Sequence, residues 1–308
     1  MTAALFPERS GGAAALRQRL TEPGVLIAPG CFDALTARLV EKAGHEAVFC
    51  GGFSVAASRL GLPDVGLLSY GEMVDQVRST AAATSLPVIA DADTGYGNAI
   101  NAQRSLLGFQ QAGAACLMIE DQRWPKRCGH TSGKELVDRH EAVARVRACV
   151  EIRDRHGLDI LIMARTDAAA CEGFDEALRR ADSFAAAGAD LTFLEAPESE
   201  SQMARYCAEV PGHKVANMVE DGLTPWLSPA ELTEIGYSLV LYPVSLLLHG
   251  VQAMGRAAEQ LRTGVSDGER AQFDEVRSLV GWPAYEDESA RFGDDTTSPD
   301  PNEPDRHA

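Results

Sequence analysis

The chain alternates short apolar runs with longer amphipathic stretches. Eight runs rich in Val, Ile, Leu and Ala have the length and composition of buried strands, and they lie at 25–30, 47–52, 87–93, 116–121, 160–168, 191–197, 214–220 and 239–245. Between the runs, apolar positions recur with the spacing of a helix, as at 33–44, 101–113, 141–157 and 174–190. Several of these stretches end in Ala-Gly, which is a usual helix stop before the next strand.

Eight strand–helix units in one chain predict an α/β fold of the (β/α)8 TIM-barrel type. A doubly wound open sheet is the alternative, but its usual G-x-G-x-x-G turn after the first strand is absent. Two further helical patterns, at 246–264 and 269–281, predict a C-terminal helical extension of a single barrel domain over 1–293. The polar, proline-rich segment 294–308 is expected to be a disordered acidic tail.

Polar residues collect at the C-terminal ends of the apolar runs, whereas the N-terminal ends are mostly apolar. The residues in question are Cys50, Gly51, Gly52, Asp91, Asp93, Glu120, Asp121, Arg165, Asp167, Glu195, Asn217 and Glu220. The C-terminal strand ends of a (β/α)8 barrel, with the loops that follow them, form the active site. The asymmetry therefore predicts an enzyme.

Charge and composition narrow the class of partner and the compartment. The net charge is −17, which argues against nucleic acid, because phosphate binding favours a basic surface. No apolar run approaches the roughly 20 residues of a membrane-spanning helix, so no membrane partner is expected. Seven cysteines without a C-x-x-C pair indicate reduced thiols and a cytoplasmic location.

Asp91 and Asp93 are the strongest indication of a metal site. On a strand, residues two apart point to the same face, and two neighbouring carboxylates repel each other unless a cation lies between them. Carboxylate oxygens favour Mg²⁺, with Mn²⁺ as an alternative, and Glu120 could complete the shell. Alternatively, one aspartate caps the next helix and the other binds a backbone turn, while Glu120 forms a buried ion pair.

A loop without strand or helix pattern surrounds Cys128. Its cations are Lys126, Arg127, His130 and Lys134. A loop over the mouth of a barrel can open and close, its cations can attract an anionic substrate, and a thiol on it can protonate a carbanion once water is excluded. The alternative is an exposed basic loop whose cysteine has no function.

Arg165 lies at an apolar strand end, where its guanidinium needs an anion. A substrate carboxylate suits the planar fork of the side chain, and the alternative is a fixed pair with Glu195 or Asp167. The backbone N–H groups of Gly51 and Gly52 could hold a second carboxylate. A metal site, carboxylate anchors and a mobile acid together predict cleavage of a carbon–carbon bond next to a 2-hydroxy or 2-oxo acid.

Six stretches resemble the isocitrate lyase/phosphoenolpyruvate mutase superfamily. They are GGFSVAASRLGLPDVGLLS, VIADADTGYGNA, IEDQRWPKRCGHTSGKELV, MARTDA, FLEAP and NMVEDGLTP, and the resemblance covers residues 15–290. It implies a (β/α)8 barrel, usually a homotetramer, in which a helix beyond the eighth strand is exchanged between neighbouring barrels.

The resemblance also implies roles for individual residues. It makes Asp64, Asp91, Asp93 and Glu120 the Mg²⁺ shell, some of them through water. It makes Cys128 the lid acid of the lyase branch, whose signature K-[KR]-C-G-H spans 126–130 here. The remaining residues implied in catalysis or substrate binding are Arg165, Glu195, His130, Cys50, Gly51, Gly52, Lys126, Gly129 and Asn217.

The expected function is a Mg²⁺-dependent lyase that splits a 2-hydroxy di- or tricarboxylate, of the 2-methylisocitrate or 2-alkylmalate type, into a 2-oxo acid and a carboxylate. Three alternatives stay open. One is phosphonomutase chemistry of the carboxyphosphonoenolpyruvate type, whose enzymes carry the same K-R-C-G-H loop. The second is hydrolysis or decarboxylation of oxaloacetate. The third is a barrel that has lost catalysis and serves as a binding subunit.

Overall fold

The computed structural model describes residues 4–7, 12–129, 131, 133–264 and 270–292. Eight parallel strands form a closed barrel in which each strand pairs with its sequence neighbours and β8 pairs with β1. The strands are β1 (Leu26–Cys31), β2 (Val48–Cys50), β3 (Val88–Asp91), β4 (Cys116–Glu120), β5 (Leu161–Thr166), β6 (Leu191–Leu194), β7 (His213–Asn217) and β8 (Leu239–Tyr242). The predicted (β/α)8 barrel is confirmed.

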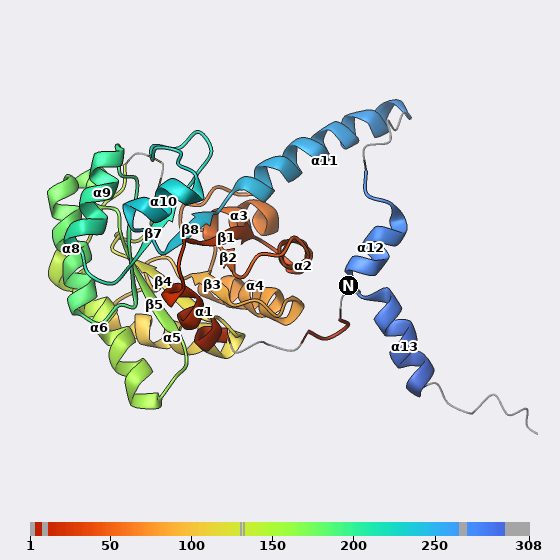
Figure 1. Ribbon diagram of the computed structural model, residues 1–308, viewed down its shortest axis with the longest axis horizontal. Coiled ribbons are helices and arrows are strands. Elements are labelled where there is room, and N and C mark those ends of the chain that lie inside the picture. The colour runs from red at the N-terminus through yellow and green to blue at the C-terminus, as the bar shows by residue number, and fades with distance from the viewer. Residues whose placement is uncertain (1–3, 8–11, 130, 132, 265–269, 293–308) are drawn as a thin grey trace, which may run out of the picture. The chain divides into compact units, whose positions relative to one another are not determined.

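The described helices are α1 (Gly12–Thr21), α2 (Ala34–Lys42), α3 (Gly52–Val55), α4 (Tyr70–Ala83), α5 (Ala99–Ala112), α6 (Arg139–His156), α7 (Ala168–Cys171), α8 (Phe174–Ala186), α9 (Glu200–Glu209), α10 (Pro229–Ile235), α11 (Ser245–Thr263), α12 (Phe273–Leu279) and α13 (Trp282–Phe292), with a π-helix at Ala56–Leu60. Helices α2 to α10 alternate with the strands and lie around the barrel (Figure 1). Within the described residues, no helix has the length and apolar character that a membrane crossing requires.

The glycines at the ends of two predicted helices stop them as expected. Gly113 after α5 has a φ of 99° and Gly157 after α6 has a φ of 59°. Both values lie in the left-handed region that a residue with a side chain adopts at a cost, and both amides donate back to carbonyls of the preceding turn. Each helix therefore ends where the chain must turn toward the next strand.

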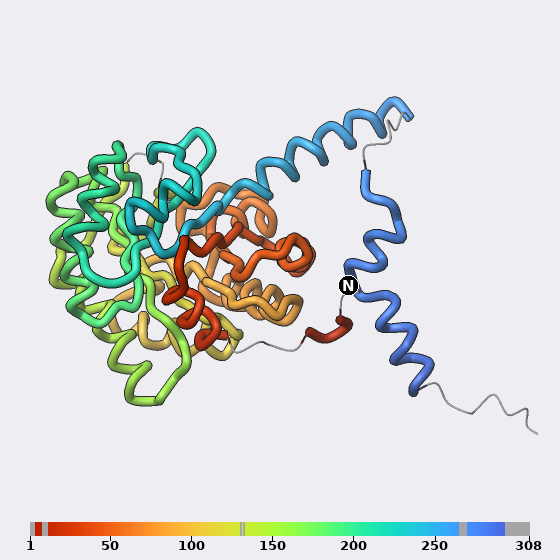
Figure 2. Tube along the Cα trace, in the orientation of Figure 1, coloured from red at the N-terminus to blue at the C-terminus, as the bar shows by residue number. Residues whose placement is uncertain are grey.

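The chain divides into two compact units, each described by itself. One comprises residues 8–267 and holds the barrel with α11; the other comprises residues 1–7 and 268–308 and holds α12 and α13. The sequence predicts one domain over 1–293, with these last helices as its extension. The predicted tail at 294–308 lies outside the described residues. Figure 2 traces the chain through both units.

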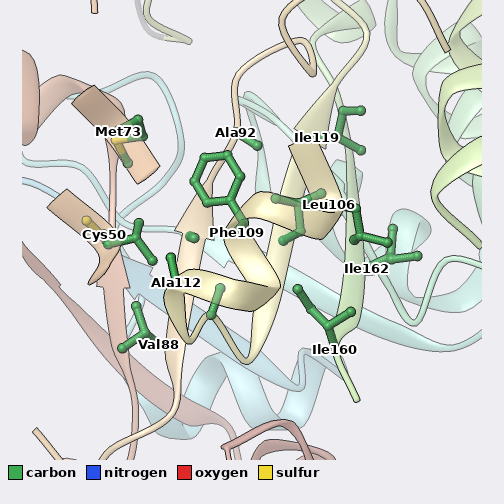
Figure 3. Packing of buried hydrophobic residues seen from close by; sticks show 14 of the residues in the cluster. Cys50, Met73, Val88, Ala92, Leu106, Phe109, Ala112, Ile119, Ile160 and Ile162 are labelled. Carbon is green, nitrogen blue, oxygen red and sulfur yellow. The ribbon is translucent and has the colours of Figure 1, made fainter. Parts of the chain in front are cut away.

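The barrel places alternate side chains on its two faces. Along β3, Ile89 packs inside the barrel with Phe49 and Met118, whereas Val88 and Ala90 belong to the layer between barrel and helices. Figure 3 shows part of that outer layer, where Leu106, Phe109 and Ala112 of α5 pack in one cluster with Val88. Asp91 lies two residues after Ile89 and so on the same face of the strand. The alternation therefore directs its side chain to the interior of the barrel at the end of the strand.

Candidate active site

A cavity of about 270 Å³ lies at the C-terminal ends of the strands. Its volume is close to the lower limit of roughly 300 Å³ that is typical of ligand pockets, so it suits a small acid. Many of the predicted site residues line it, namely Gly51, Gly52, Asp64, Asp91, Lys126, Cys128, Gly129, Arg165, Glu195 and Asn217. Residues from five strand ends and two loops are thus brought together.

Asp91 is held by two backbone amides. Its Oδ2 accepts from the N–H of Gly52 at 2.9 Å and its Oδ1 accepts from the N–H of Asp93 at 3.0 Å. Strand β3 ends at Asp91, and Asp93 has a φ of 48°, in the left-handed region. The prediction that both aspartates share one strand face is therefore wrong, because the chain turns between them. The alternative, in which one of them binds a backbone turn, describes Asp91.

Asp91 and Asp93 nevertheless converge on Gly52. A Cβ built on that glycine would lie 3.1 Å from Asp91 Oδ2 and 3.4 Å from Asp93 Oδ1. Lys126 Nζ would lie 3.3 Å from the same Cβ. All three groups are buried, so a side chain at position 52 would displace a charged atom from a site that is closed to solvent. The close approach of these charged groups leaves little room for a side chain at position 52.

Lys126 bridges two carboxylates of this cluster. Its Nζ lies 2.6 Å from Asp64 Oδ1 and 2.7 Å from Asp93 Oδ1. Burial raises the pKa of Asp93 to about 7, because the attraction of Lys126 does not outweigh desolvation and the charge of Asp91. Burial alone would lower the pKa of Lys126, but Asp93 and Asp64 raise it well above its usual value. Lys126 is therefore a cation in a cluster of acids.

Arg165 is surrounded by carboxylates at the end of β5. Its Nε and Nη2 lie 3.0 Å from the two oxygens of Asp167, and Nη2 lies 3.2 Å from Glu195 Oε2. Glu120 Oε2 is 3.7 Å from Nε. Although burial alone would lower the pKa of Arg165, these acids raise it well above its usual value. The alternative of a fixed pair with Asp167 and Glu195 is what the structure contains, and Arg165 also lines the pocket.

The loop around Cys128 is here called the lid (121–137), and its described residues Lys126, Cys128, Gly129 and Thr131 line the pocket. Its two ends pair with each other, since the N–H of Arg123 donates to the carbonyl of Glu135 at 2.7 Å. At its centre, a Cβ built on Gly129 would collide with Arg165 Nη2 and would lie 2.8 Å from Glu195 Oε2. The lid backbone at Gly129 thus lies close to Arg165 and Glu195, and Cys128 is among the residues that line the cavity.

Comparison with known proteins shows the family to which the chain belongs. The profile of the phosphoenolpyruvate phosphomutase family matches residues 16–262. The chain belongs to this family. It is 44% identical over 274 residues to 2,3-dimethylmalate lyase of Eubacterium barkeri, covering 87% of this chain and 94% of that protein. It is 35% identical over 282 residues to 2-methylisocitrate lyase of Aeropyrum pernix, covering 89% of each.

Solved structures of the same superfamily have the same fold. A crystal structure of 2,3-dimethylmalate lyase superposes with a TM-score of 0.87 at 35% identity, covering 93% of this chain and 97% of that one. Phosphonopyruvate hydrolase, solved in complex with oxalate and Mg²⁺, superposes with a TM-score of 0.81 at 28% identity, covering 92% and 99%. The resemblance that the sequence motifs indicate is confirmed, and so is membership of a superfamily that contains carbon–carbon lyases.

The acidic cluster fits a divalent metal, which the family implies. Its donors are carboxylate oxygens, the ligands that Mg²⁺ prefers, and Glu120 Oε1 is buried without a hydrogen-bond partner among the described residues. No three His, Cys, Asp or Glu side chains of the described residues converge closely enough to hold one ion directly. That spacing agrees with Mg²⁺, which keeps several waters and takes one or two carboxylates.

One predicted site residue, Cys50, lies away from the cavity. Cys50 is fully buried and packs in the layer between barrel and helices with Met73 and Val88 (Figure 3). It does not line the cavity, because Phe49 takes the inward-facing position of the strand. His130 lies outside the described residues. Asp93 and Glu120 are not among the lining residues but contact Lys126 and Arg165, which are.

Sequence reasoning did not assign a role to the buried network beneath Arg165. Asp121 accepts from Thr166 Oγ1 at 2.7 Å, from the N–H of Asp167 at 3.0 Å and from Arg180 Nη1 at 3.1 Å. Arg180, on α8, also donates to the carbonyl of Val137 at the end of the lid at 3.0 Å. The sequence feature that could have indicated this network is Arg180 on the apolar side of an amphipathic helix, since a buried guanidinium requires an acid.

Proposed function

We propose that this protein is a Mg²⁺-dependent carbon–carbon lyase. It splits a small 2-hydroxy di- or tricarboxylate, of the 2-methylisocitrate or 2-alkylmalate type, into a 2-oxo acid and a carboxylate. The observation that carries the proposal is the position of Cys128, on a lid whose neighbouring Gly129 touches Arg165 and Glu195 at the floor of an acid-lined cavity. Relatives named for lyase activity on such acids support it.

The residues divide into those that hold the substrate and those that complete the reaction. Arg165 and the amide of Asn217 line the cavity and can donate to carboxylate oxygens. Lys126 adds positive charge between Asp64 and Asp93. Lid contact with the floor excludes water, which strengthens each of these interactions.

The reaction balances without an external oxidant or reductant. The bond between the hydroxyl-bearing carbon and its neighbour breaks, and its electron pair stays on the neighbour, which is stabilised by its own carboxylate. The hydroxyl loses its proton and becomes the carbonyl of the 2-oxo acid. The described carboxylates that line the cavity, and can accept this proton, are Asp64, Asp91, Glu195, Glu220 and Asp221. Cys128 donates a proton to the departing carbon.

The metal would be held by Asp91, with Asp64, Asp93 and Glu120 through water. When bound, Mg²⁺ supplies positive charge that orients and polarises the substrate's oxygens. Mn²⁺ suits the same donors. The protein's own part is to keep several carboxylates in one buried place, where burial and mutual repulsion already raise the pKa of Asp93.

A substrate panel tests this function. Purified protein with Mg²⁺ is given 2,3-dimethylmalate, other 2-alkylmalates, 2-methylisocitrate and oxaloacetate, and 2-oxo acid release is measured with and without EDTA. We expect metal-dependent release from at least one 2-hydroxy acid. Release of oxalate from oxaloacetate alone would favour the hydrolase alternative, and formation of a carbon–phosphorus bond by phosphorus NMR would favour the phosphonomutase.

We further propose a homotetramer in the cytoplasm. Helix α11 leaves Val251, Met254 and Leu261 more than half exposed in the single chain, and a row of large apolar side chains on one helix is typical of a protein interface. Exchange of this helical region between neighbouring barrels, as the family resemblance implies, would cover these apolar side chains. All seven cysteines are free thiols, which suits a reducing compartment.

A further inference from the structure

We infer that this pocket selects a 2-hydroxy dicarboxylate with an alkyl group on the departing carbon over a tricarboxylate, and that Leu248 sets this preference. The inference rests on the proposed lyase function and makes its substrate class narrower. It follows from how polar and apolar residues divide the cavity, and from the number of cations that face it.

The cavity has a charged side and an apolar side. The charged side comes from the ends of β3, β5, β6 and β7 and the lid, which contribute Asp91, Arg165, Glu195, Asn217 and Lys126. The apolar side comes mainly from the segments that follow β2 and β8, with one residue from the loop after β7. It consists of Phe53 at the start of α3, Val219 after β7, and Pro243, Val244 and Leu248 around the start of α11.

The apolar side is fixed in place by the backbone. Ser54 Oγ donates to the carbonyl of Pro243 at 2.9 Å, which ties the start of α3 to the chain that leads into α11. A Cβ on Gly30 would collide with the same carbonyl, so β1 also packs closely against Pro243. Leu248 lies in the first turn of α11, just after this anchored segment, and lines the cavity, although it remains 44% exposed.

The cations available to a substrate are few. Among the described residues that line the cavity, the cationic side chains are Lys126 and Arg165. Each already faces carboxylates of the protein, Lys126 those of Asp64 and Asp93 and Arg165 those of Asp167 and Glu195. Together with a divalent metal they can receive the two carboxylates of a small diacid. A third carboxylate would have no cation on the apolar side.

The rim next to the apolar side is acidic. Glu220 and Asp221 follow β7 and line the cavity. One oxygen of Glu220 is buried without a hydrogen-bond partner among the described residues, and its charge contributes to the raised pKa of Tyr242. A substrate carboxylate at this end would face like charge in a partly desolvated place, which is unfavourable.

The two acids after which the relatives are named, 2,3-dimethylmalate and 2-methylisocitrate, differ at one group. Both have a methyl, a hydroxyl and a carboxylate on the carbon that becomes the 2-oxo acid. The carbon that departs carries a carboxylate in both, with a methyl group in 2,3-dimethylmalate and a carboxymethyl group in 2-methylisocitrate. With the shared groups on the charged side, the apolar side receives the group that differs. Leu248 and Phe53 suit the methyl and not the carboxylate.

The experiment compares these two acids directly. Values of kcat/KM are measured with Mg²⁺ for wild type, Leu248→Arg and Leu39→Arg. Leu39 lies on α2, is 43% exposed and does not line the cavity, so it controls for adding a charge to a half-exposed helix position. Calorimetry of both acids with Cys128→Ser measures binding separately from turnover.

We expect wild type to favour 2,3-dimethylmalate by at least about a hundred-fold, since one mismatched group in a pocket changes kcat/KM by about ten- to two-hundred-fold and an unpaired carboxylate adds to this. Leu248→Arg should raise kcat/KM for 2-methylisocitrate and lower it for 2,3-dimethylmalate, each by about ten-fold or more. Leu39→Arg should change neither.

Other outcomes overturn the inference. Equal or better turnover of 2-methylisocitrate by wild type contradicts the selection, and this result does not depend on any variant folding. An unchanged ratio in Leu248→Arg, or an equal shift in Leu39→Arg, removes Leu248 as the determinant. If neither acid is turned over and neither binds in calorimetry, the proposed function itself is wrong and the inference fails with it. Turnover with the opposite preference would refute the inference alone.

Discussion

The buried cations of the site are paired with carboxylates of the protein before any substrate arrives. Lys126 lies between Asp64 and Asp93, and Arg165 lies between Asp167 and Glu195. An isolated charge in such a place would cost several kcal/mol, so each cation makes the burial of its acids possible. Substrate binding is thus an exchange of partners within a charged cluster, which favours small anions over neutral molecules.

The sequence predicts which residues lie at the site more reliably than it predicts which side chains they contact. The position of Lys126 in K-R-C-G-H predicts a substrate contact, yet its ammonium group lies on two carboxylates. Its partners depend on how far the lid folds back over the barrel, and no local pattern encodes that distance. Cys50 illustrates the same limit. Neighbouring residues of a strand point to opposite faces, so a shift of one residue decides whether a side chain points into the barrel or away from it.

The proposed role of the Cys128 thiol gives a prediction for a single residue. Replacing Cys128 by serine removes the acid while keeping the size of the side chain, so turnover should fall by roughly a hundred- to ten-thousand-fold without a change in the unfolding midpoint. Cys171→Ser is the matched control, since this exposed thiol does not line the cavity. Normal turnover by Cys128→Ser would remove the thiol from the mechanism.

At the scale of elements, α8 connects the lid to the barrel. Arg180 reaches from this helix to Asp121 at the end of β4, to Glu172 after α7 and to the carbonyl at Val137. Burial raises the pKa of Asp121 to about 6, even with Arg180 beside it. The network holds Thr166, the last residue of β5, and Asp167, which follows it, and thereby the surroundings of Arg165.

Removing Arg180 should therefore destabilise the protein. Arg180→Met leaves Asp121 buried without its cation, and we expect the free energy of unfolding to fall by about 3–5 kcal/mol, as measured by urea denaturation. The neighbouring Arg179→Met removes an exposed pair with Glu176 and should change stability by less than about 1 kcal/mol. Equal effects of the two substitutions would show that the buried network does not stabilise the fold.

The lid is held near its C-terminal end by Lys134. Its ammonium donates to Asp167 Oδ1 at 2.9 Å and to the carbonyl of Gly129. Burial raises the pKa of Asp167, but Arg165 and Lys134 outweigh burial and hold the value at about 2. The ion pair therefore persists throughout the pH range in which the protein is expected to work.

Loss of this contact should loosen the lid and leave the barrel intact. For Lys134→Met we expect faster tryptic cleavage within 121–137 and a fall in kcat of about a hundred-fold, because small displacements of a catalytic group are costly. Arg123→Met, which removes an exposed lid cation 3.6 Å from Glu135, serves as the control. If cleavage and kcat stay at wild-type values, the lid is held by other contacts.

Elements were predictable where local chemistry specifies them. All eight strands lie within the predicted apolar runs or extend one residue beyond them, as β1 and β7 do, because continuous apolar runs are typical of strands buried on both faces. The turn at Asp93 was not predictable, since its left-handed φ depends on a tertiary contact between Asp91 and the amide of Gly52. Short helices such as α3 and α7 lack the length to show a period.

At the scale of the whole molecule, the order of elements determines the architecture. Parallel strands joined by right-handed helical crossovers close into a barrel once eight are present, and this brings strand ends far apart in sequence to one mouth. The mouth of the barrel could therefore be assigned before any side-chain contact was known. The arrangement of α12 and α13 could not, because their apolar side chains have no partner defined by sequence alone.

The proposed assembly gives a prediction for the complete protein. Light scattering should report a mass about four times the 32.9 kDa of the chain, since the apolar residues of α11 favour association. A double substitution, Val251→Asp with Met254→Asp, should lower the mass by placing charges on that face. A single-chain mass for the wild type would contradict the homotetramer without affecting the chemistry proposed for the pocket.

The central claim is that this barrel breaks a carbon–carbon bond and protonates the departing carbon within the closed pocket. The most direct measurement is the reaction with 2,3-dimethylmalate and Mg²⁺ in deuterated water, followed by proton NMR. The account predicts a 2-oxo acid and a carboxylic acid in equal amounts, with one solvent-derived deuterium on the carbon next to the new acid's carboxylate. Unchanged substrate with all 2-hydroxy acids, or products without that deuterium, would contradict it.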